Sequence, residues 1–116
     1  MVLWIGFDLQ AEIEAGGDSN LTALHYAAWF GKEAVAAQLL QSGASVSAVD
    51  DVYGSTPLLY AALNGKSSIA NLLLQANASP TAVDKNGDTP AHDAKHQGHG
   101  YLAAMLLEAE QAAALK

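Results

Sequence analysis

Three histidines in one short segment are the residues of this sequence best suited to chemistry. His92, His96 and His99 follow one another at spacings of i, i+4 and i+7, and Asp93 stands beside the first. Three neutral imidazoles could chelate a divalent metal. Two histidines at i and i+4 with an acidic residue between them come near the H-E-x-x-H pattern of zinc sites. A metal-dependent hydrolase is therefore one hypothesis to weigh.

Physical objections argue against this metal site. Asp93 is one methylene shorter than the glutamate of the zinc pattern, and His99 lies beyond Gly98, a residue type that ends helices, so the three rings need not share a face. The sequence also holds no G-x-S-x-G motif, no G-x-x-x-x-G-K-[ST] loop and no cysteine. We predict no catalytic site, no native metal site and no cofactor, and we expect any binding of nickel or zinc to be adventitious.

The charge of the chain narrows the classes of partner. The 116 residues include 12 acidic and 5 basic ones, which gives a net charge of −7. A nucleic-acid binder needs a basic face, and so does a polybasic membrane patch, so we expect neither nucleic acid nor membrane as a partner. No apolar run is long enough to span a membrane. We expect a soluble, intracellular and cytoplasmic protein that favours a basic partner surface.

The sequence repeats itself. After a shift of 34 residues, 16 of the 31 residues from 20 to 50 are identical, where unrelated sequences would share about two. A shift of 33 residues then aligns Gly54 with Gly87 and Thr56 with Thr89. The one-residue difference lies at the Asp50-Asp51 pair, in a turn where an insertion costs little stability.

Each repeat has the pattern of two helices. A threonine that can cap a helix (Thr22, Thr56 or Thr89) precedes a short apolar segment that runs to a glycine. A second segment has apolar residues at i, i+1, i+4 and i+5, which form one face of a helix. Segments 45–55 and 79–88, rich in Asp, Asn, Gly and Ser, predict extended turns or hairpins. The expected helices are 4–15, 23–30, 34–42, 57–64, 67–76, 90–97 and 101–114. The expected core residues are Leu24, Ala27, Val35, Leu39, Leu40, Leu58, Ala61, Ile69, Leu72, Leu73, Leu74, Met105 and Leu106.

The start of each repeat resembles the T-P-L-H-x-A signature of the ankyrin repeat, whose period is about 33 residues. The signature stands as T-A-L-H-Y-A from Thr22, as T-P-L-L-Y-A from Thr56 and as T-P-A-H-D-A from Thr89. An Asp-x-x-Gly lead-in precedes the second and third copies. This resemblance implies an all-α ankyrin-repeat solenoid of three helix–turn–helix units with β-hairpin-like turns. It covers residues 18–116, which divide into units 18–50, 51–83 and 84–116.

Two positions depart from the signature. Leu59 replaces its histidine in the second unit, and Lys95 replaces a second alanine in the third. A lysine cannot lie dry between repeats without a partner, so we expect Lys95 to face water and the third unit to be the C-terminal cap. The resemblance implies that the signature histidines His25 and His92 hydrogen-bond within the stack.

The first 17 residues do not match a full repeat. Ile5, Leu9 and Ile13 form a stripe at i, i+4 and i+8, which predicts an N-terminal capping helix for residues 1–17. The remaining apolar residues are more than a cap needs, and they are Val2, Leu3, Trp4 and Phe7. We expect them to pack under the first repeat, or else to mark a truncation or a self-association surface.

The resemblance also implies where a partner would bind. In the family, turn tips and the residues just before the mid-repeat glycine usually contact the partner. Trp29 and Phe30 are adjacent in a predicted helix and point about 100° apart, so at least one should be exposed. Tyr53, in the next turn, extends this strip, and Trp and Tyr are favoured contact residues. The doubled acid Asp50-Asp51 predicts a turn held by an Asx hydrogen bond, with a contact to a basic partner as the alternative. The predicted partner-binding residues are Leu21, Trp29, Phe30, Val52, Tyr53, Leu63, Asn64, Lys85, Asp88 and His96.

The leading functional hypothesis is a non-catalytic protein–protein interaction module, an adaptor or scaffold that binds a protein partner on its concave face. The alternative is a structural capping or oligomerisation segment of a longer repeat protein. We expect a monomer, with a homodimer through the apolar N-terminus as the competing state. The sequence does not name the protein partner, because recognition positions vary freely on a shared scaffold.

Overall fold

Threonine caps begin the first helix of every repeat in the computed structural model, which describes residues 21–115. The hydroxyl oxygens of Thr22, Thr56 and Thr89 each accept the backbone N–H three residues later, at 3.2 to 3.3 Å. Such a bond satisfies one of the free donors at a helix start. The helices are α2 (Ala23–Phe30), α3 (Glu33–Gln41), α4 (Pro57–Leu63), α5 (Ser67–Gln75), α6 (Pro90–His96) and α7 (Gly100–Ala114). Every expected helix within the described residues is present, and each boundary agrees within one residue. The expected helix 4–15 lies outside the described residues.

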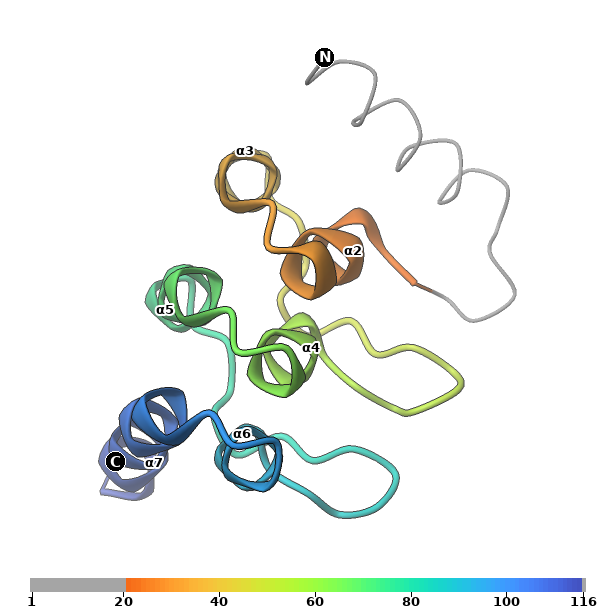
Figure 1. Ribbon diagram of the computed structural model, residues 1–116. Helices are drawn as coiled ribbons and strands as arrows, with labels where there is room; N and C mark the ends of the chain where they lie inside the picture. The colour runs from red at the N-terminus through yellow and green to blue at the C-terminus, as the bar shows by residue number, and fades with distance from the viewer. Residues whose placement is uncertain (1–20, 116) are drawn as a thin grey trace.

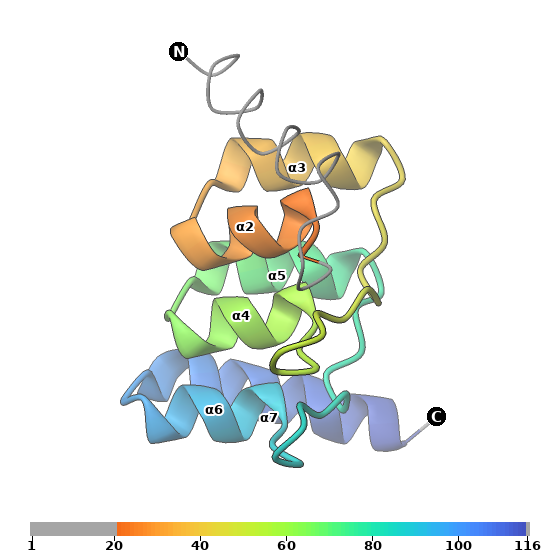
Figure 2. The ribbon, with the colours of Figure 1, turned by 90° about the vertical axis from the view of Figure 1, so that its right-hand side faces the viewer.

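The helices form two layers (Figure 1). Helices α2, α4 and α6 stack into an inner layer, in which each contacts the next, and α3, α5 and α7 form the outer layer behind them. A second view shows each helix pair as one rung of a ladder (Figure 2). The turns 45–55 and 79–88 project beyond the inner layer, and residues 21–115 contain no β-strand. This arrangement confirms the all-α repeat solenoid. Among the described helices, none has the length and apolar character to cross a membrane.

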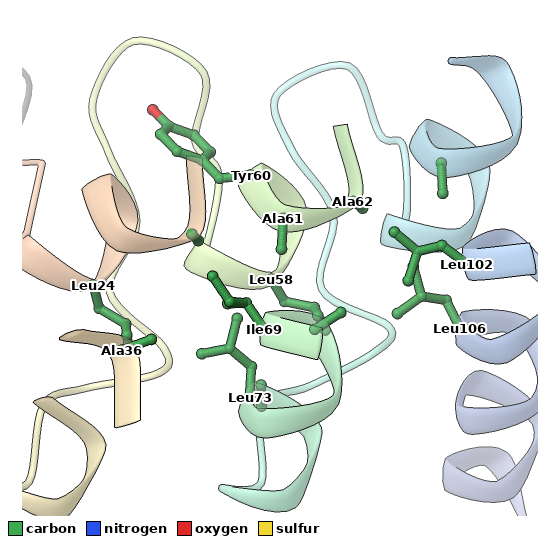
Figure 3. Close-up of a cluster of buried hydrophobic side chains, with 14 of the residues drawn as sticks. Leu24, Ala36, Leu58, Tyr60, Ala61, Ala62, Ile69, Leu73, Leu102 and Leu106 are labelled. Atoms are coloured by element: carbon green, nitrogen blue, oxygen red, sulfur yellow. The ribbon is translucent and has the colours of Figure 1, made fainter. Parts of the chain in front are cut away.

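Alanine fills the contacts between neighbouring inner helices. Ala27, Ala28, Ala61, Ala62 and Ala94 are all fully buried. Small side chains let helix axes approach closely. Between the two layers the core is built mainly from leucine, as Figure 3 shows for the middle of the stack. The largest buried apolar side chains are Leu24, Leu58, Leu59, Ile69, Leu73, Leu102 and Leu106.

The expected core is correct for the inner layer and only partly so for the outer one. Leu73 is fully buried, while Leu72 and Leu74 beside it are half-buried. Consecutive helical residues point about 100° apart, and an outer helix is covered mainly on the side that faces the inner layer. Only one of three consecutive leucines can therefore be fully buried. The other expected core residues that prove half-buried are Val35, Leu39, Leu40 and Met105.

A buried histidine joins the first repeat to the turn of the second. His25 is fully buried, and its Nδ1 accepts the backbone N–H of Thr22 at 3.1 Å. Its Nε2 lies 2.8 Å from the carbonyl oxygen of Ser55, which can only accept, so Nε2 carries the proton. Burial lowers the pKa of His25, and the Ser55 carbonyl and the Asp50 charge oppose this only in part. The ring is therefore held neutral. Its bond to the Ser55 carbonyl confirms the expected hydrogen bond between helix and turn.

The equivalent positions in the other repeats behave differently. Leu59 is fully buried, so apolar packing replaces the hydrogen bond in the second repeat. The expectation for His92 is wrong: its side chain is exposed, and its Nε2 lies 3.4 Å from Oδ1 of Asp88 in the same repeat. No further turn packs over α6 within the described residues, so this imidazole has no carbonyl to bridge to. Lys95 is exposed, as expected.

Replacing His25 should destabilise the stack far more than replacing its counterpart His92. In the variant His25→Ala the Ser55 carbonyl keeps only the Asp50 N–H as a donor, and a fully buried ring is lost. Together these changes cost about 1–3 kcal/mol. We expect the free energy of unfolding, measured by urea denaturation at pH 7 with circular dichroism, to fall by that amount. His92→Ala, which removes the same side chain from an exposed position, should change it by less than about 0.5 kcal/mol. Equal losses in the two variants would show that the bridge to Ser55 contributes nothing.

Candidate partner-binding groove

The inner helices present one stripe of side chains toward the turns. The stripe consists of the residues four, seven and eight positions after each capping threonine, a spacing that places them on one helical face. These residues are Tyr26, Trp29 and Phe30 in α2, Tyr60 and Leu63 with the following Asn64 at α4, and Asp93 and His96 with the following Gln97 at α6. The stripe thus changes from aromatic in the first repeat to polar and acidic in the third.

Aromatic side chains of the first two repeats surround a hollow of about 460 Å³, which we call the aromatic hollow. Trp29 packs edge-on against Tyr60 with ring centroids 5.6 Å apart, and Tyr26 is stacked with Phe30 at 6.5 Å. The ring of Tyr60 points away from the buried leucines (Figure 3). The hollow is lined by Leu21, Tyr26, Trp29, Phe30, Tyr53, Tyr60 and Leu63.

The rim of the aromatic hollow is open to solvent. Trp29, Phe30 and Tyr53 keep 40%, 58% and 63% of their surface exposed. Single exposed apolar residues are common on proteins, but aromatic residues gathered around one concavity are typical of a binding surface. Both Trp29 and Phe30 are exposed, which satisfies the expectation that at least one of the pair would be.

A buried aspartate holds Tyr53 in place. The carboxylate of Asp50 accepts the backbone N–H groups of Val52, Tyr53 and Ser55 at 3.1, 2.9 and 2.8 Å. Burial raises the pKa of Asp50, but these donors and the Tyr60 hydroxyl outweigh it, so the pKa lies below its ordinary value. Asp50 thus forms the expected Asx turn, while Asp51 is exposed.

A second hollow of about 360 Å³ lies between the second and third repeats, and we call it the acidic hollow. It shares Tyr53 and Leu63 with the aromatic hollow, so the two are adjacent. Carboxylate oxygens of Asp84, Asp88 and Asp93 line it and lie within 4.8 Å of one another. Three acidic oxygens this close attract a cation, either a metal ion or a basic side chain.

Asp93 has the least favourable environment of these three carboxylates. It keeps only 6% of its surface exposed, and its Oδ2 has no hydrogen-bond partner. Burial and the nearby charges of Asp84 and Asp88 raise the pKa of Asp93 to about 6. Asp84 is better satisfied, because its Oδ1 accepts the backbone N–H groups of Asn86 and Asp88 at 2.9 and 3.1 Å.

Nine of the ten predicted partner-binding residues line the two hollows, including Val52, Asp88 and His96 in the acidic one. Lys85 also lines the acidic hollow, but its ammonium group donates to the carbonyl oxygen of Asp51. Phe30 and Leu21 complete the other end of the groove. The structure therefore brings the exposed aromatic pair together with the turn that follows.

Asn64, by contrast, lines neither hollow. Its side-chain Nδ2 donates to the carbonyl oxygen of Trp29 at 2.8 Å. His99 makes the equivalent contact one repeat later, with Nε2 at 3.1 Å from the Leu63 carbonyl oxygen. Gly65 permits this approach, because it has a left-handed φ of 67° and a Cβ there would lie 2.7 Å from the His99 ring. Both contacts fix the ends of the inner helices that carry the groove.

The three histidines do not converge on one ligand position. The rings of His92 and His96 stack with centroids 6.2 Å apart, whereas His99 turns to the Leu63 carbonyl of the neighbouring repeat. Within residues 21–115, the group of side chains that lies close enough to share an ion consists of the three aspartates instead.

Sequence reasoning missed Tyr26, Tyr60 and Asp93, which all line the groove. They occupy the same place, the variable x of the T-P-L-H-x-A signature. This position lies three residues before Trp29, Leu63 and His96, on the same helical face. The three-residue spacing from the predicted contact positions would therefore have been enough to identify these three residues.

Comparison with known families identifies the repeat. A family model described as ankyrin repeats in three copies matches residues 24–115. No curated protein matches the chain.

Removing the charge of Asp93 should stabilise the protein at neutral pH. Because the pKa of Asp93 is raised to about 6 from an ordinary 3.8, the folded state binds more protons than the unfolded state between these values. Stability contributed by this group is therefore lost as the pH rises through that window. We expect Asp93→Asn to raise the free energy of unfolding by about 1–3 kcal/mol at pH 7 and to change it little near pH 4, in urea titrations at both pH values.

Glu108→Gln is the matched control, since Glu108 is an exposed carboxylate on α7. It should change stability little at pH 7. Two results would show that the charge of Asp93 is not unfavourable. One is a lower free energy of unfolding for Asp93→Asn at pH 7, and the other is an increase near pH 4 as large as that at pH 7.

Proposed function

The chain belongs to the ankyrin-repeat family, and from this premise we propose that it is a non-catalytic recognition module that binds a protein partner in the groove formed by the two hollows. Ankyrin repeats are in general protein–protein interaction modules and are typically non-catalytic. The partner would bind on the concave side of the inner layer, which faces the turns. The partner-binding residues are those predicted from sequence that line the hollows, together with Tyr26, Tyr60 and Asp93.

The observation that carries this proposal is the exposed aromatic rim of the aromatic hollow. Trp29, Phe30 and Tyr53 come from a helix and from the following turn, and together they leave an apolar concavity open. Tryptophan and tyrosine are the residue types that dominate binding energy in protein interfaces. An apolar side chain of a partner would bury surface there without needing a polar partner of its own.

The groove is also held rigid before a partner arrives. Asn64 fixes the carbonyl of Trp29, and the carboxylate of Asp50 fixes the turn that carries Tyr53. Side chains on a fixed backbone lose less conformational entropy on binding than those on a loose one. This supports recognition of a partner by a preformed surface.

Trp29→Ala should abolish most of the affinity for peptides that bind the groove. We would select binders from a random peptide library displayed on phage, synthesise the enriched peptides and measure their Kd by fluorescence polarisation. Truncation of a contact-dominating aromatic residue costs about 2 kcal/mol or more, which corresponds to a Kd about 30-fold weaker.

The matched control is Tyr101→Ala, which removes an aromatic residue that is 79% exposed on α7 in the outer layer. It should leave the Kd unchanged. Peptides that bind the Trp29→Ala variant as tightly as the parent protein would place the binding surface elsewhere and contradict the proposal.

A further inference from the structure

Two buried polar atoms in the acidic hollow lack a hydrogen-bond partner. One is Oδ2 of Asp93 on α6, and the other is the hydroxyl oxygen of Ser55 in the turn between the first two repeats. Ser55 is 1% exposed and Asp93 is 6% exposed. Native proteins pair nearly all of their buried polar atoms, and an unpaired carboxylate oxygen is the costlier of the two. Two such atoms from different elements of one hollow point to a ligand that carries donors.

The cationic side chains around the hollow leave its charge uncompensated. Lys85 turns its ammonium group to the carbonyl oxygen of Asp51. Among residues 21–115, the ionic partner of the three carboxylates is a single group, the His92 imidazole at 3.4 Å from Asp88. No basic side chain of the described residues pairs with Asp93 or Asp84, so a cation from outside fits the site.

We infer that the partner segment carries an arginine whose guanidinium enters the acidic hollow and donates to Asp93, Asp84 and the Ser55 hydroxyl, beside an apolar side chain in the aromatic hollow. This inference rests on the function proposed above and specifies the chemistry of the partner. The planar guanidinium has five donors and forms paired bonds to carboxylates. The net charge of −7 attracts such a basic segment at long range.

The shape of the hollow favours a side chain over a bare metal ion. Its volume of about 360 Å³ is far larger than an ion needs, and part of its wall is apolar, formed by Val52, Tyr53 and Leu63. An arginine places its methylene stem against such a wall and its charged head against the carboxylates. A divalent metal would gain nothing from the apolar part.

The two hollows set the spacing of the partner residues. They are displaced by one repeat, since one lies between the first and second repeats and the other between the second and third. Packed helices stand about 10 Å apart, and an extended chain advances about 3.3 Å per residue. The arginine should therefore stand about three residues from the apolar anchor.

The test uses the full chain and the selected peptides. In a chosen nonapeptide the arginine is replaced by citrulline, which has nearly the same shape but no charge. On the parent protein this change should weaken the Kd by about tenfold, since hydrogen bonds to charged groups are worth that much or more. On Asp93→Asn the same change should cost clearly less, below about fourfold, because the contact to Asp93 is already absent while that to Asp84 remains. Glu108→Gln should keep the full tenfold loss.

The peptide selection itself can overturn the inference. If the selected peptides depend on Trp29 for binding but carry no arginine at this spacing, the inference fails while the proposed function stands. If no selected peptide depends on Trp29, both the inference and the proposed function fail.

The variant and metal measurements can also overturn the inference. If replacing arginine by citrulline weakens the Kd equally on the parent and on Asp93→Asn, the arginine binds elsewhere. A rise in Tm of the parent in millimolar Ca²⁺ or Mg²⁺ that is absent in Asp93→Asn would assign the carboxylates to a metal. Asp93→Asn is expected to be the more stable protein, so loss of folding does not confuse the result.

Discussion

Close packing of alanine between neighbouring inner helices is the constraint on which the rest of this structure depends. Ala27, Ala28, Ala61, Ala62 and Ala94 are fully buried, and a larger side chain at these contacts would push the helices apart. Because small residues hold the stack together, the remaining face of each inner helix is free to carry large or charged side chains. The groove is built from that free face, together with the turns that the inner helices support.

The local features of this fold could be predicted from the sequence because each depends on residues close together in the chain. The threonine caps, the helix-ending glycines and the repeat period fixed the helices within one residue. Val35 and Met105 were expected in the core but are only half-buried, because burial depends on which side of an outer helix a neighbouring helix covers. The place of Asp93 in the acidic hollow was missed for the same kind of reason. Asp93 is unremarkable as a single residue in a helix, and it becomes buried and crowded only when the turn of its own repeat folds back over it.

The groove also shows how one position can change character while the scaffold stays the same. The variable residue of the signature is Tyr26 in the first repeat, Tyr60 in the second and Asp93 in the third. Each side chain stands at the same place on its helix, so the surface passes from aromatic to acidic within two repeats. At Asp93 this costs stability, because burial and like charges raise its pKa. Residues that destabilise a fold are often retained for function, and the carboxylate is here placed where a basic ligand could relieve it.

The two turns of the stack close with the same hydrogen bond although they differ in length. The N–H of Asp50 donates to the carbonyl of Ser55 at 3.2 Å, and that of Asp84 donates to the carbonyl of Asp88 at 3.1 Å. One loop thus encloses an additional residue, and Tyr53 stands at its tip, where its carbonyl accepts the N–H of Lys85 at 2.9 Å. Insertions and deletions at this place can lengthen or shorten the reach of the residue at the loop tip without disturbing any helix. Evolution can therefore retune such a surface by adjusting loop length, a route independent of exchanging one side chain for another.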